Sequence, residues 1–547
     1  MTQNFRRWTI LLSVLATFGL IVGFHPLSAE AYPFVSISEI QGDGFTTPYN
    51  YQYVETTGIV TADYQYESKR GYFIQDPVGD GDPATSEGLF VYDRYDSVSL
   101  GDEVLIAGRI TEYDELTEMG YTQYCYVLSS DNPLPEPVEL NPPSDDTASD
   151  IYYEALECML VTVSEMDIVA GTDVYGEAAG VVADSDIDHV FRDDPAGTGE
   201  IIFTDDAGGY VLNVRTGNVV KGLVGPLDYT YDEYKILPVR DAQIEVIPKG
   251  SGIGLGRGRA ETRGISIASY NMFNLFESGY GDVEVKLAKH ALTIREYLRE
   301  PDLIAVQEVE NPELLELLAN TPPIIADYGV VLIEGPDSRG IDVGLLYRTD
   351  KISIISYEAR QTTTDLDDGY GPGGGLLFSR PPLVVHLEIL GKGKKAESSD
   401  LWVIVNHFKS KSVYAPYYAD TTPRRVEQAA WVGSLVDEIQ VTDPDAQVIV
   451  IGDLNDFEDS EPIQTLVDGG LHDLIYDVDK EDRYTYIYRG VSQVLDHILI
   501  TPSLEEIVNE VMVFHSNIDF PNPLYGEDPT IGIRSSDHDL LLAGFDI

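Results

Sequence analysis

The sequence predicts an α/β domain in the C-terminal half of the chain, preceded by two small all-β domains. From residue 265 onward, apolar runs of strand length alternate with segments whose apolar residues recur at helical spacing. Between residues 34 and 248, short apolar or aromatic runs are separated by Gly, Asp and Pro, as in β-strands joined by turns. At 547 residues the chain is long enough for more than one domain.

The N-terminal segment has the features of a signal peptide. Arg6 and Arg7 precede an almost unbroken apolar run from Trp8 to Phe24, and Ala29-Glu30-Ala31 fits a signal-peptidase site. We therefore predict a signal peptide over residues 1–31 and a secreted, extracellular protein without stable membrane association. The alternative is an uncleaved segment that anchors the chain outside the membrane, because the apolar run approaches the length of a short membrane span.

Two β domains are predicted over residues 32–132 and 133–248. A Pro-rich stretch, residues 133–143, marks the boundary between them. The segment Gly101–Tyr113 is similar to the segment Gly217–Tyr229, which indicates a weak internal repeat. Two similar small β-barrels in tandem would explain that repeat.

The chain has two cysteines, Cys125 and Cys158, and both precede the C-terminal half. In an oxidising compartment they could form a disulfide. Two buried free thiols fit equally well, because nothing in the sequence places the two residues side by side. With so few cysteines, the fold depends on its apolar cores.

A Gly-rich stretch over residues 249–263 separates the β domains from the C-terminal half. It also contains Arg257 and Arg259, so it could cradle a phosphate, but the strand–GxxxxGK[ST]–helix context of such loops is missing. We predict a flexible linker. Residues 264–547 then form the C-terminal domain, where apolar spacing predicts helices over 283–298, 312–318 and 424–439.

The chain is strongly acidic. It has 93 Asp and Glu against 35 Lys and Arg, which gives a formal net charge of −58. Nucleic-acid-binding proteins usually carry basic patches, and this charge would repel a polyanion at low salt. Either the protein works at high ionic strength, where screening shortens the repulsion, or its substrate is small or approached through bound cations. We favour high ionic strength, because an acidic excess is more often a solubility adaptation.

Six short polar clusters in the C-terminal half each follow an apolar run. Strand ends are where catalytic groups are usually held. Carboxylates for a divalent cation, imidazoles for proton transfer and amides for orientation suit the hydrolysis of a phosphate ester. The clusters are SYNMFN (269–274), VQEVEN (306–311), VNHFKSKS (405–412), GDLND (452–456), LDH (495–497) and SSDH (535–538).

In this order the six clusters resemble the endonuclease/exonuclease/phosphatase superfamily, over roughly residues 263–547. GDLND and SSDH are the most specific motifs. The resemblance implies a four-layer α/β sandwich, in which two β-sheets pack face to face between outer helices. The β domains resemble, less strongly, the OB-like modules that precede the catalytic domain in secreted bacterial and archaeal nucleases.

The resemblance also implies a set of metal ligands. Glu308 would be the main ligand of a divalent cation, with Asp537 and Asn271 beside it. Mg²⁺ is the expected ion, with Mn²⁺ or Ca²⁺ as alternatives, since hard oxygen ligands select such metals. Family members often have an acidic residue two positions after the Asn, but this chain has Phe273 there, which weakens the case for a second ligand at that end.

The same resemblance assigns the catalytic and substrate-binding residues. His538 would be the general base or a phosphate-binding imidazole, with Asp496 fixing its tautomer. His407 would contact the phosphate or assist the leaving group. Asp453 and Asn455 would orient the attacking water and the phosphate. Arg380 and Lys409 would contact the phosphate. His497, in LDH, is left out of this set.

The sequence therefore predicts a secreted, divalent-metal-dependent, monomeric nuclease that cuts DNA, RNA or both, acting as an endonuclease. A phosphomonoesterase or a lipid phosphodiesterase of the same superfamily is the first alternative. A non-catalytic binding protein on a nuclease-like fold is the second, although the intact site residues argue against it. The sequence leaves open DNA against RNA, endo against exo cleavage, and the number of metal ions.

Overall fold

The computed structural model describes residues 32–183, 187–195, 197–239, 243–248, 264–366, 375–391, 398–411 and 420–547. The predicted signal peptide, residues 1–31, and the predicted linker, residues 249–263, lie outside these ranges. Within the described ranges we find no helix with the length and apolar character of a membrane span.

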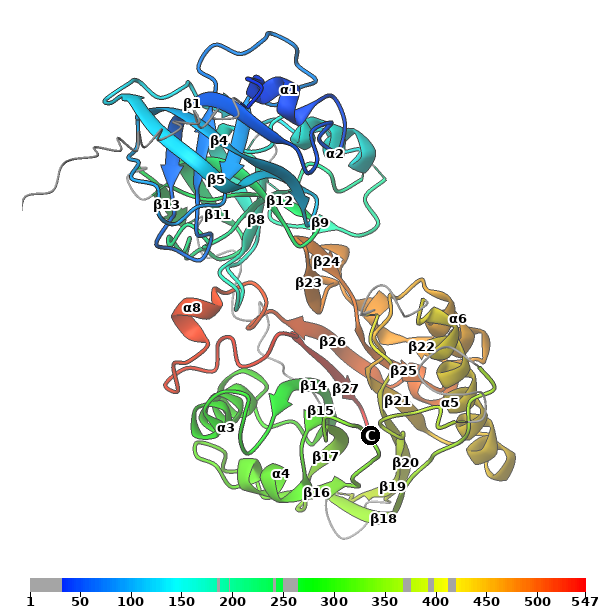
Figure 1. Cartoon of the computed structure of the whole chain (residues 1–547). Helices are drawn as coiled ribbons and strands as arrows, with labels where there is room; N and C mark the ends of the chain where they lie inside the picture. The colour runs from blue at the N-terminus through cyan, green and yellow to red at the C-terminus, as the bar shows by residue number, and fades with distance from the viewer. Residues whose placement is uncertain are drawn as a thin grey trace, which may run out of the picture.

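The first β domain is a closed barrel (Figure 1), and its interior is filled by an apolar core. The strand order is β1-β2-β3-β5-β4, and the antiparallel pairing of β1 with β4 closes the barrel. Side chains such as Val54, Ile74 and Val104 are fully buried inside it. The strands are β1 (Tyr53–Asp63), β2 (Tyr72–Gln75), β3 (Gly88–Val91), β4 (Glu103–Tyr113) and β5 (Leu116–Ser129).

The second β domain is a seven-stranded sheet in the order β13-β11-β12-β10-β8-β7-β6, and an additional pairing of β11 with β7 folds it back on itself. The two segments that are similar in sequence, Gly101–Tyr113 and Gly217–Tyr229, contain β4 and most of β11. The strands are β6 (Val138–Glu139), β7 (Leu160–Ala170), β8 (Ala178–Val182), β10 (Ile202–Thr204), β11 (Asn218–Thr230), β12 (Glu233–Ile236) and β13 (Glu245–Pro248).

Each β domain also contains a short helix, which corrects the expectation of all-β domains. The helix α1 (Ile37–Gln41) begins with a capping box between Ser36 and Glu39. The helix α2 (Asp146–Glu154) is capped by Asp145, whose side chain accepts a hydrogen bond from the Ala148 amide. Such caps satisfy backbone amides that a short helix leaves without partners.

Cys125 and Cys158 do not pair. Both are free thiols, and Cys158 is fully buried. Cys125 lies on β5 and receives a hydrogen bond from the Tyr72 hydroxyl at 3.6 Å. No disulfide therefore supports the β domains at these positions.

The C-terminal domain contains two six-stranded mixed sheets with a shared core. One sheet has the order β16-β17-β15-β14-β27-β26, and the other has the order β18-β19-β20-β21-β25-β22. The strands are β14 (Ile265–Leu275), β15 (Leu303–Val309), β16 (Tyr328–Leu332), β17 (Asp342–Arg348), β18 (Ile352–Ala359), β19 (Leu383–Ile389), β20 (Ser399–His407), β21 (Val448–Asp453), β22 (His472–Asp473), β25 (Asp496–Ile500), β26 (Val508–Phe514) and β27 (Leu540–Phe545).

One apolar cluster joins the two sheets, because it contains Leu303 and Leu345 from the first sheet and Val403 and Ile451 from the second. Helices cover the other faces. The cluster on the far side of the first sheet includes residues of α3 (Val283–Leu292) and α4 (Pro312–Ala319). The cluster on the second sheet includes residues of α5 (Thr422–Thr442) and α6 (Glu461–Asp468).

The three helices predicted from apolar spacing are confirmed. The first is α3, which continues as a π-helical turn over Thr293–Tyr297. The others are α4 and α5, and α5 extends slightly beyond the predicted ends. In each case the apolar residues face a sheet, so the spacing of apolar residues in the sequence correctly predicted the buried side of the helix.

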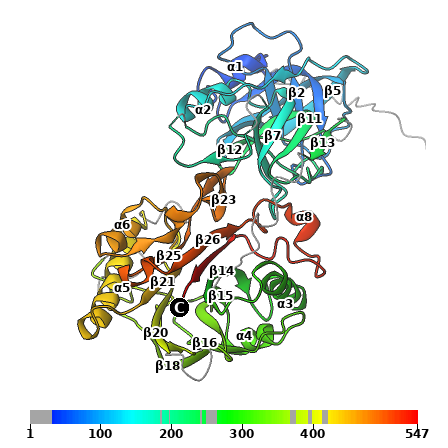
Figure 2. The same ribbon diagram turned by 180° about the vertical axis from the view of Figure 1, so that it is seen from behind.

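A small three-stranded sheet connects the second β domain to the C-terminal domain (Figures 1 and 2). Its strands are β23 (Tyr486–Tyr488) and β24 (Val491–Gln493) from the C-terminal domain, and β9 (Val190–Phe191) from the second β domain. Val491 and Ser492 pair in parallel with Val190 and Phe191. The β23–β24 hairpin is thus held by both domains.

Candidate active site

The polar clusters meet where strands of the two sheets end. In the first sheet β14 runs parallel to β15, and in the second β20 runs parallel to β21. Parallel strands place their carboxyl ends at the same edge, so Asn271 lies near Glu308 and His407 lies opposite Asp453. Contacts between Asn271 and Asp453, and between His407 and Glu308, show that the two edges face each other.

The backbone takes left-handed conformations at several of these ends. Glu308 has φ 62°, Asn274 has φ 52° and Asn455 has φ 51°. The pairing of β15 with β17 is irregular between Val306 and Val309, and there the Glu308 carboxylate turns to accept the Asn274 amide at 2.9 Å. Backbone strain of this kind collects at functional sites.

His538 and Asp496 form a buried imidazole–carboxylate pair. Asp496 Oδ2 lies 2.8 Å from His538 Nδ1, so His538 Nε2 is the ring nitrogen that faces the site. Burial alone lowers the pKa of His538, but the carboxylates of Asp496 and Asp453 outweigh it and raise the pKa well above its ordinary value. The pair is therefore built to stabilise a charged imidazole.

His407 has the opposite electrostatic environment. Its Nε2 lies 3.4 Å from Asp453 Oδ2 and 3.9 Å from Glu308 Oε1. Burial, followed by the nearby guanidinium groups of Arg380 and Arg339, lowers the pKa of His407 well below its ordinary value. This ring is neutral near pH 7, while its neighbour His538 favours the charged form.

Asp453 lies between the two imidazoles. Its Oδ2 is 3.4 Å from His407 Nε2 and 3.9 Å from His538 Nε2, and it accepts a hydrogen bond from Asn271 Nδ2 at 3.1 Å. Its Oδ1 accepts the Asn455 amide at 2.9 Å. Burial raises the pKa of Asp453 to about 7, and the carboxylates of Asp496 and Glu308 act in the same direction.

Arg380 supports the end of β20. It donates to the carbonyl oxygens of His407 at 3.3 Å and Phe408 at 2.6 Å, and it pairs with Asp337 at 3.0 Å. These contacts hold the His407 backbone and engage all three guanidinium nitrogens of Arg380. Its predicted contact with phosphate therefore stays a prediction.

Lys409 follows His407 in the loop after β20. Its ammonium donates to Ser410 Oγ at 3.2 Å. Burial and the neighbouring charges of Arg380 and Arg339 lower the pKa of Lys409 to about 8. Asn455 donates its side-chain amide to the Phe408 carbonyl at 3.2 Å, so it lies close to the same loop.

The chemistry of the donor set fits a hard divalent cation. Burial raises the pKa of Asp537 to about 6, and the Glu308 carboxylate adds to this effect. Such mutually repelling carboxylates, together with the Asn271 amide oxygen, are the ligand types that Mg²⁺ and Ca²⁺ prefer. In the described part of the chain, however, no three His, Cys, Asp or Glu side chains already converge as a ready metal centre.

The structure adds three residues that the sequence did not reveal. Tyr486 packs against His538 with 4.8 Å between ring centroids. Ser536 donates to the Asn271 carbonyl at 2.7 Å and accepts the His538 amide at 3.1 Å, which ties the SSDH loop to β14. Lys286 donates to the carbonyl oxygens of Phe273 and Asn274 at 2.8 and 2.9 Å.

Only one of these residues had a signal in the sequence. Ser536 is part of the SSDH motif, whereas Tyr486 and Lys286 are ordinary members of a strand and a helix. His497, which we left out of the site, contacts Asp473 at 2.7 Å and the Asp456 carbonyl at 2.9 Å. It is fully buried and makes structural contacts away from His538.

Comparisons with known proteins find family matches in two parts of the chain. Residues 278–518 match a family model described as the Endonuclease/Exonuclease/phosphatase family. Residues 131–248 match a model described only as a domain of unknown function. No curated protein matches the chain.

Several solved structures are similar at low identity. An endonuclease/exonuclease/phosphatase from Bacteroides vulgatus is 18% identical, with a TM-score of 0.36, over 51% of this chain and 97% of that one. Truncated TDP2 of Caenorhabditis elegans is 17% identical, with a TM-score of 0.35, over 51% and 97%. A mannosyl-6-phosphatase of Bacteroides thetaiotaomicron is 17% identical, with a TM-score of 0.36, over 51% and 98%.

Proposed function

The C-terminal domain belongs to the endonuclease/exonuclease/phosphatase family, and from this premise we propose that the chain is a divalent-metal-dependent nuclease. Members of the family hydrolyse phosphoester bonds. One observation carries the proposal. His407, whose pKa is lowered, and His538, whose pKa is raised, both lie within 4 Å of Asp453, and His407 also lies beside Glu308. Such a pair suits a diester, which needs a proton taken from water and help for a leaving oxygen.

In this proposal His538 is the general base. Asp496 fixes its tautomer through Nδ1, so Nε2 of the neutral ring takes the proton of the attacking water, and the charged form that the raised pKa favours is inactive until it loses its proton. The surrounding carboxylates, which raise the pKa of His538, stabilise the imidazolium that forms. Asp453 and Asn455, joined by a 2.9 Å hydrogen bond, orient the water and the phosphate.

His407 acts on the phosphate from the neutral state. Its lowered pKa keeps a proton on one ring nitrogen only, so it can donate one hydrogen bond to a phosphate oxygen or to the leaving oxygen. Arg380 holds the His407 carbonyl, and Lys409 follows in the same loop. Contacts of these two side chains with phosphate would add charge-assisted hydrogen bonds.

A divalent cation would be held by Glu308, Asp537 and Asn271. Bound there, it would supply charge stabilisation for the phosphoryl oxygens. Mg²⁺ is the expected ion, with Mn²⁺ or Ca²⁺ as alternatives, since all ligands are oxygen atoms. Asn271 Nδ2 donates to Asp453, so the amide atom that would contact the cation is the oxygen, which also accepts the Phe273 amide at 3.0 Å.

The proposal extends to the fold and location of the protein. A four-layer α/β sandwich is supported by the core between the two sheets and by the helices on their outer faces. OB-like β domains are supported by the five-stranded closed barrel. Domain boundaries at residues 132, 248 and 263, secretion, and a monomeric state are part of the same proposal.

A substrate panel tests the proposed activity. Purified protein is incubated with Mg²⁺ and, separately, with plasmid DNA, single-stranded DNA, RNA, bis(p-nitrophenyl) phosphate and p-nitrophenyl phosphate. We expect cleavage of nucleic acid and of the diester, with little release from the monoester. Rapid hydrolysis of the monoester alone would instead identify a phosphomonoesterase, and inactivity on every substrate would support a binding protein.

Salt is expected to stabilise this nuclease and to leave it active. The net charge of −58 produces self-repulsion in the compact state. At 1 M salt the screening length falls to about 3 Å, which relieves that repulsion but also weakens contacts with phosphates. We expect the first effect to dominate, so the melting temperature should rise with NaCl while activity persists. Highest stability and activity in salt-free buffer would contradict this expectation.

A further inference from the structure

The second β domain forms one wall of a cavity that reaches the active site. This junction cavity, of about 330 Å³, is lined on one side by Phe273, Tyr486 and Asp537 of the C-terminal domain. On the other side it is lined by Tyr175 and Tyr231 of the second β domain. A ligand held at Asp537 would therefore extend directly onto the second β domain.

Specific contacts fix this wall in position. His189 of the second β domain lies between Ser492 Oγ, at 2.9 Å, and the Tyr484 hydroxyl, at 3.0 Å. Arg489, on the β23–β24 hairpin, pairs with Glu233 at 3.0 Å. Together with the pairing of β24 with β9, these contacts give the surface between the two domains a defined shape.

Tyrosines from both domains line the junction cavity, and one of them packs on the proposed catalytic imidazole. Tyr486 packs on His538, and Tyr488, two residues along the same strand, points to the same face of the hairpin. Among the tyrosines that line the cavity, Tyr175 is 75% exposed, Tyr231 is 82% exposed and Tyr488 is 55% exposed. Aromatic faces left in water beside an active site are suited to stack with planar ligand groups.

The charges in the junction cavity are nearly balanced. Lys235 is paired with Glu177, and Arg489 is paired with Glu233, which leaves Arg534 to offset Asp173 and Asp537. A planar, uncharged group can therefore enter without meeting a strong field. A second phosphate would gain little from these side chains.

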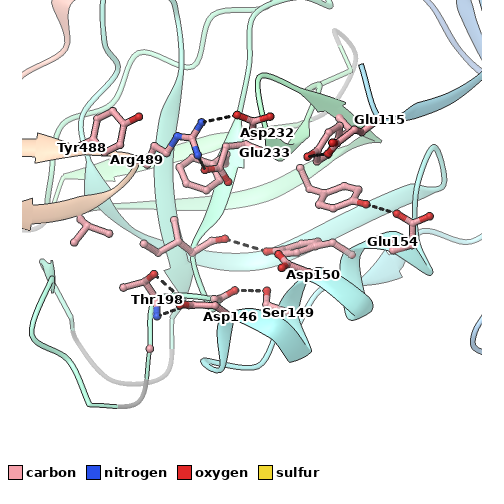
Figure 3. Close-up of a pocket in the computed structure, with 18 of the residues that line it drawn as sticks. Glu115, Asp146, Ser149, Asp150, Glu154, Thr198, Asp232, Glu233, Tyr488 and Arg489 are labelled. Carbon is pink, nitrogen blue, oxygen red and sulfur yellow. Dashed lines mark hydrogen bonds and ion pairs between the residues drawn. The ribbon is translucent and has the colours of Figure 1, made fainter. Parts of the chain in front are cut away.

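A neighbouring cavity has a different character (Figure 3). It has a volume of about 940 Å³, is lined mainly by the second β domain and also by Phe45 and Glu115 of the first, and shares Phe203, Glu233, Tyr488 and Arg489 with the junction cavity. Seven carboxylates line it against two guanidinium groups. That excess repels phosphates, so an anionic strand would not continue from the junction cavity into it.

From these observations we propose that the junction cavity binds the nucleobase next to the scissile phosphate of a single-stranded nucleic acid, with Tyr175 and Tyr231 as stacking platforms. The inference rests on the proposed nuclease function. It explains how a strongly acidic protein holds its polymer substrate: affinity comes from stacking on aromatic faces, which does not depend on a basic surface.

The test compares a substrate that has bases with one that lacks them. In the full chain, the double variant Y175A/Y231A is assayed on a base-containing single-stranded oligonucleotide and on an abasic oligonucleotide of the same length. We expect kcat/KM for the oligonucleotide to fall about 10- to 100-fold, mainly through KM, because stacking losses have this size. Hydrolysis of the abasic oligonucleotide should stay within about twofold of wild type, since it has no base to stack and His538 and Glu308 are untouched.

Two further variants separate stacking from structural damage. Y175F/Y231F keeps both aromatic faces and should retain wild-type kcat/KM on the oligonucleotide. Y66A/Y95A removes two tyrosines that are 88% and 90% exposed and do not line the junction cavity, and it should also behave as wild type. The Arg489 contact with the Tyr231 backbone carbonyl remains in every variant.

Each outcome has a definite meaning. Unchanged oligonucleotide cleavage by Y175A/Y231A, or an equal loss on both substrates, overturns the stacking proposal and leaves the nuclease proposal standing. A large loss in Y175F/Y231F overturns it as well, because hydroxyl contacts would then carry the binding. A wild-type protein that cleaves neither substrate with added Mg²⁺ or Mn²⁺ overturns the nuclease function and, with it, this inference.

Discussion

Replacing His538 with alanine is expected to lower kcat by about 10²–10⁴-fold, the usual contribution of a positioned general acid or base. The expectation follows from the 2.8 Å contact between Asp496 Oδ2 and His538 Nδ1, which directs Nε2 to the site. Because the side chain is buried and close to Asp453, its loss removes the proton acceptor without touching Glu308. The measurement is steady-state hydrolysis of bis(p-nitrophenyl) phosphate under saturating Mg²⁺.

A double-variant cycle shows whether Asp496 acts through His538. D496N alone should lower kcat, because the amide no longer stabilises the imidazolium. In the background of H538A, the same D496N change should cost nothing further, since residues that act as a unit are not additive. H472A is the matched control, because His472 also contacts a carboxylate, Asp477, at 3.4 Å but lies at the surface. A fully active H538A enzyme would remove the general base from this mechanism.

The parts of the fold that follow from local patterns were predictable. Helices α3, α4 and α5 each have apolar residues on one side, and each packs that side on a sheet. The β23–β24–β9 sheet was not predictable, because its strands have only two or three residues and pair across a domain boundary. Nothing in a short run such as Val190–Phe191 indicates a partner some 300 residues away.

The candidate site likewise has features that the sequence predicts and features that it does not. Clusters at strand ends pointed to Asn271, Glu308, His407, Asp453 and His538, and the structure brings these residues together. Their unequal electrostatics could not be foreseen, because the pKa of His407 depends on Arg380 and Arg339, which reach it only after folding. The position of Tyr486 on His538 likewise depends on the second β domain holding the hairpin.

Removing the divalent cation is the second change for which we expect a large effect on activity. Activity should disappear in excess EDTA and return when Mg²⁺ or Mn²⁺ is added, because a cation contributes several kcal/mol of charge stabilisation in such sites. E308Q should lose activity by roughly a hundredfold or more in saturating Mg²⁺, a loss that corresponds to those several kcal/mol. The change is nearly isosteric, and the Gln oxygen can still accept the Asn274 amide that now bonds Glu308 Oε2 at 2.9 Å, so the fold should persist.

The control for E308Q is E310Q, two residues along the chain. Glu310 accepts the Glu277 amide at 2.6 Å outside the site, so this variant loses the same charge without losing a ligand. We expect wild-type activity from E310Q and a higher Mg²⁺ requirement from any residual activity of E308Q. Equal Mg²⁺ dependence of wild type and E308Q would show that Glu308 is not a ligand.

Full activity in chelator would mean that the buried carboxylates of Asp453 and Asp537 act without a cation. Their pKa values, raised to about 7 and about 6, would then leave them partly protonated near neutral pH, and the reaction would depend on the two imidazoles alone.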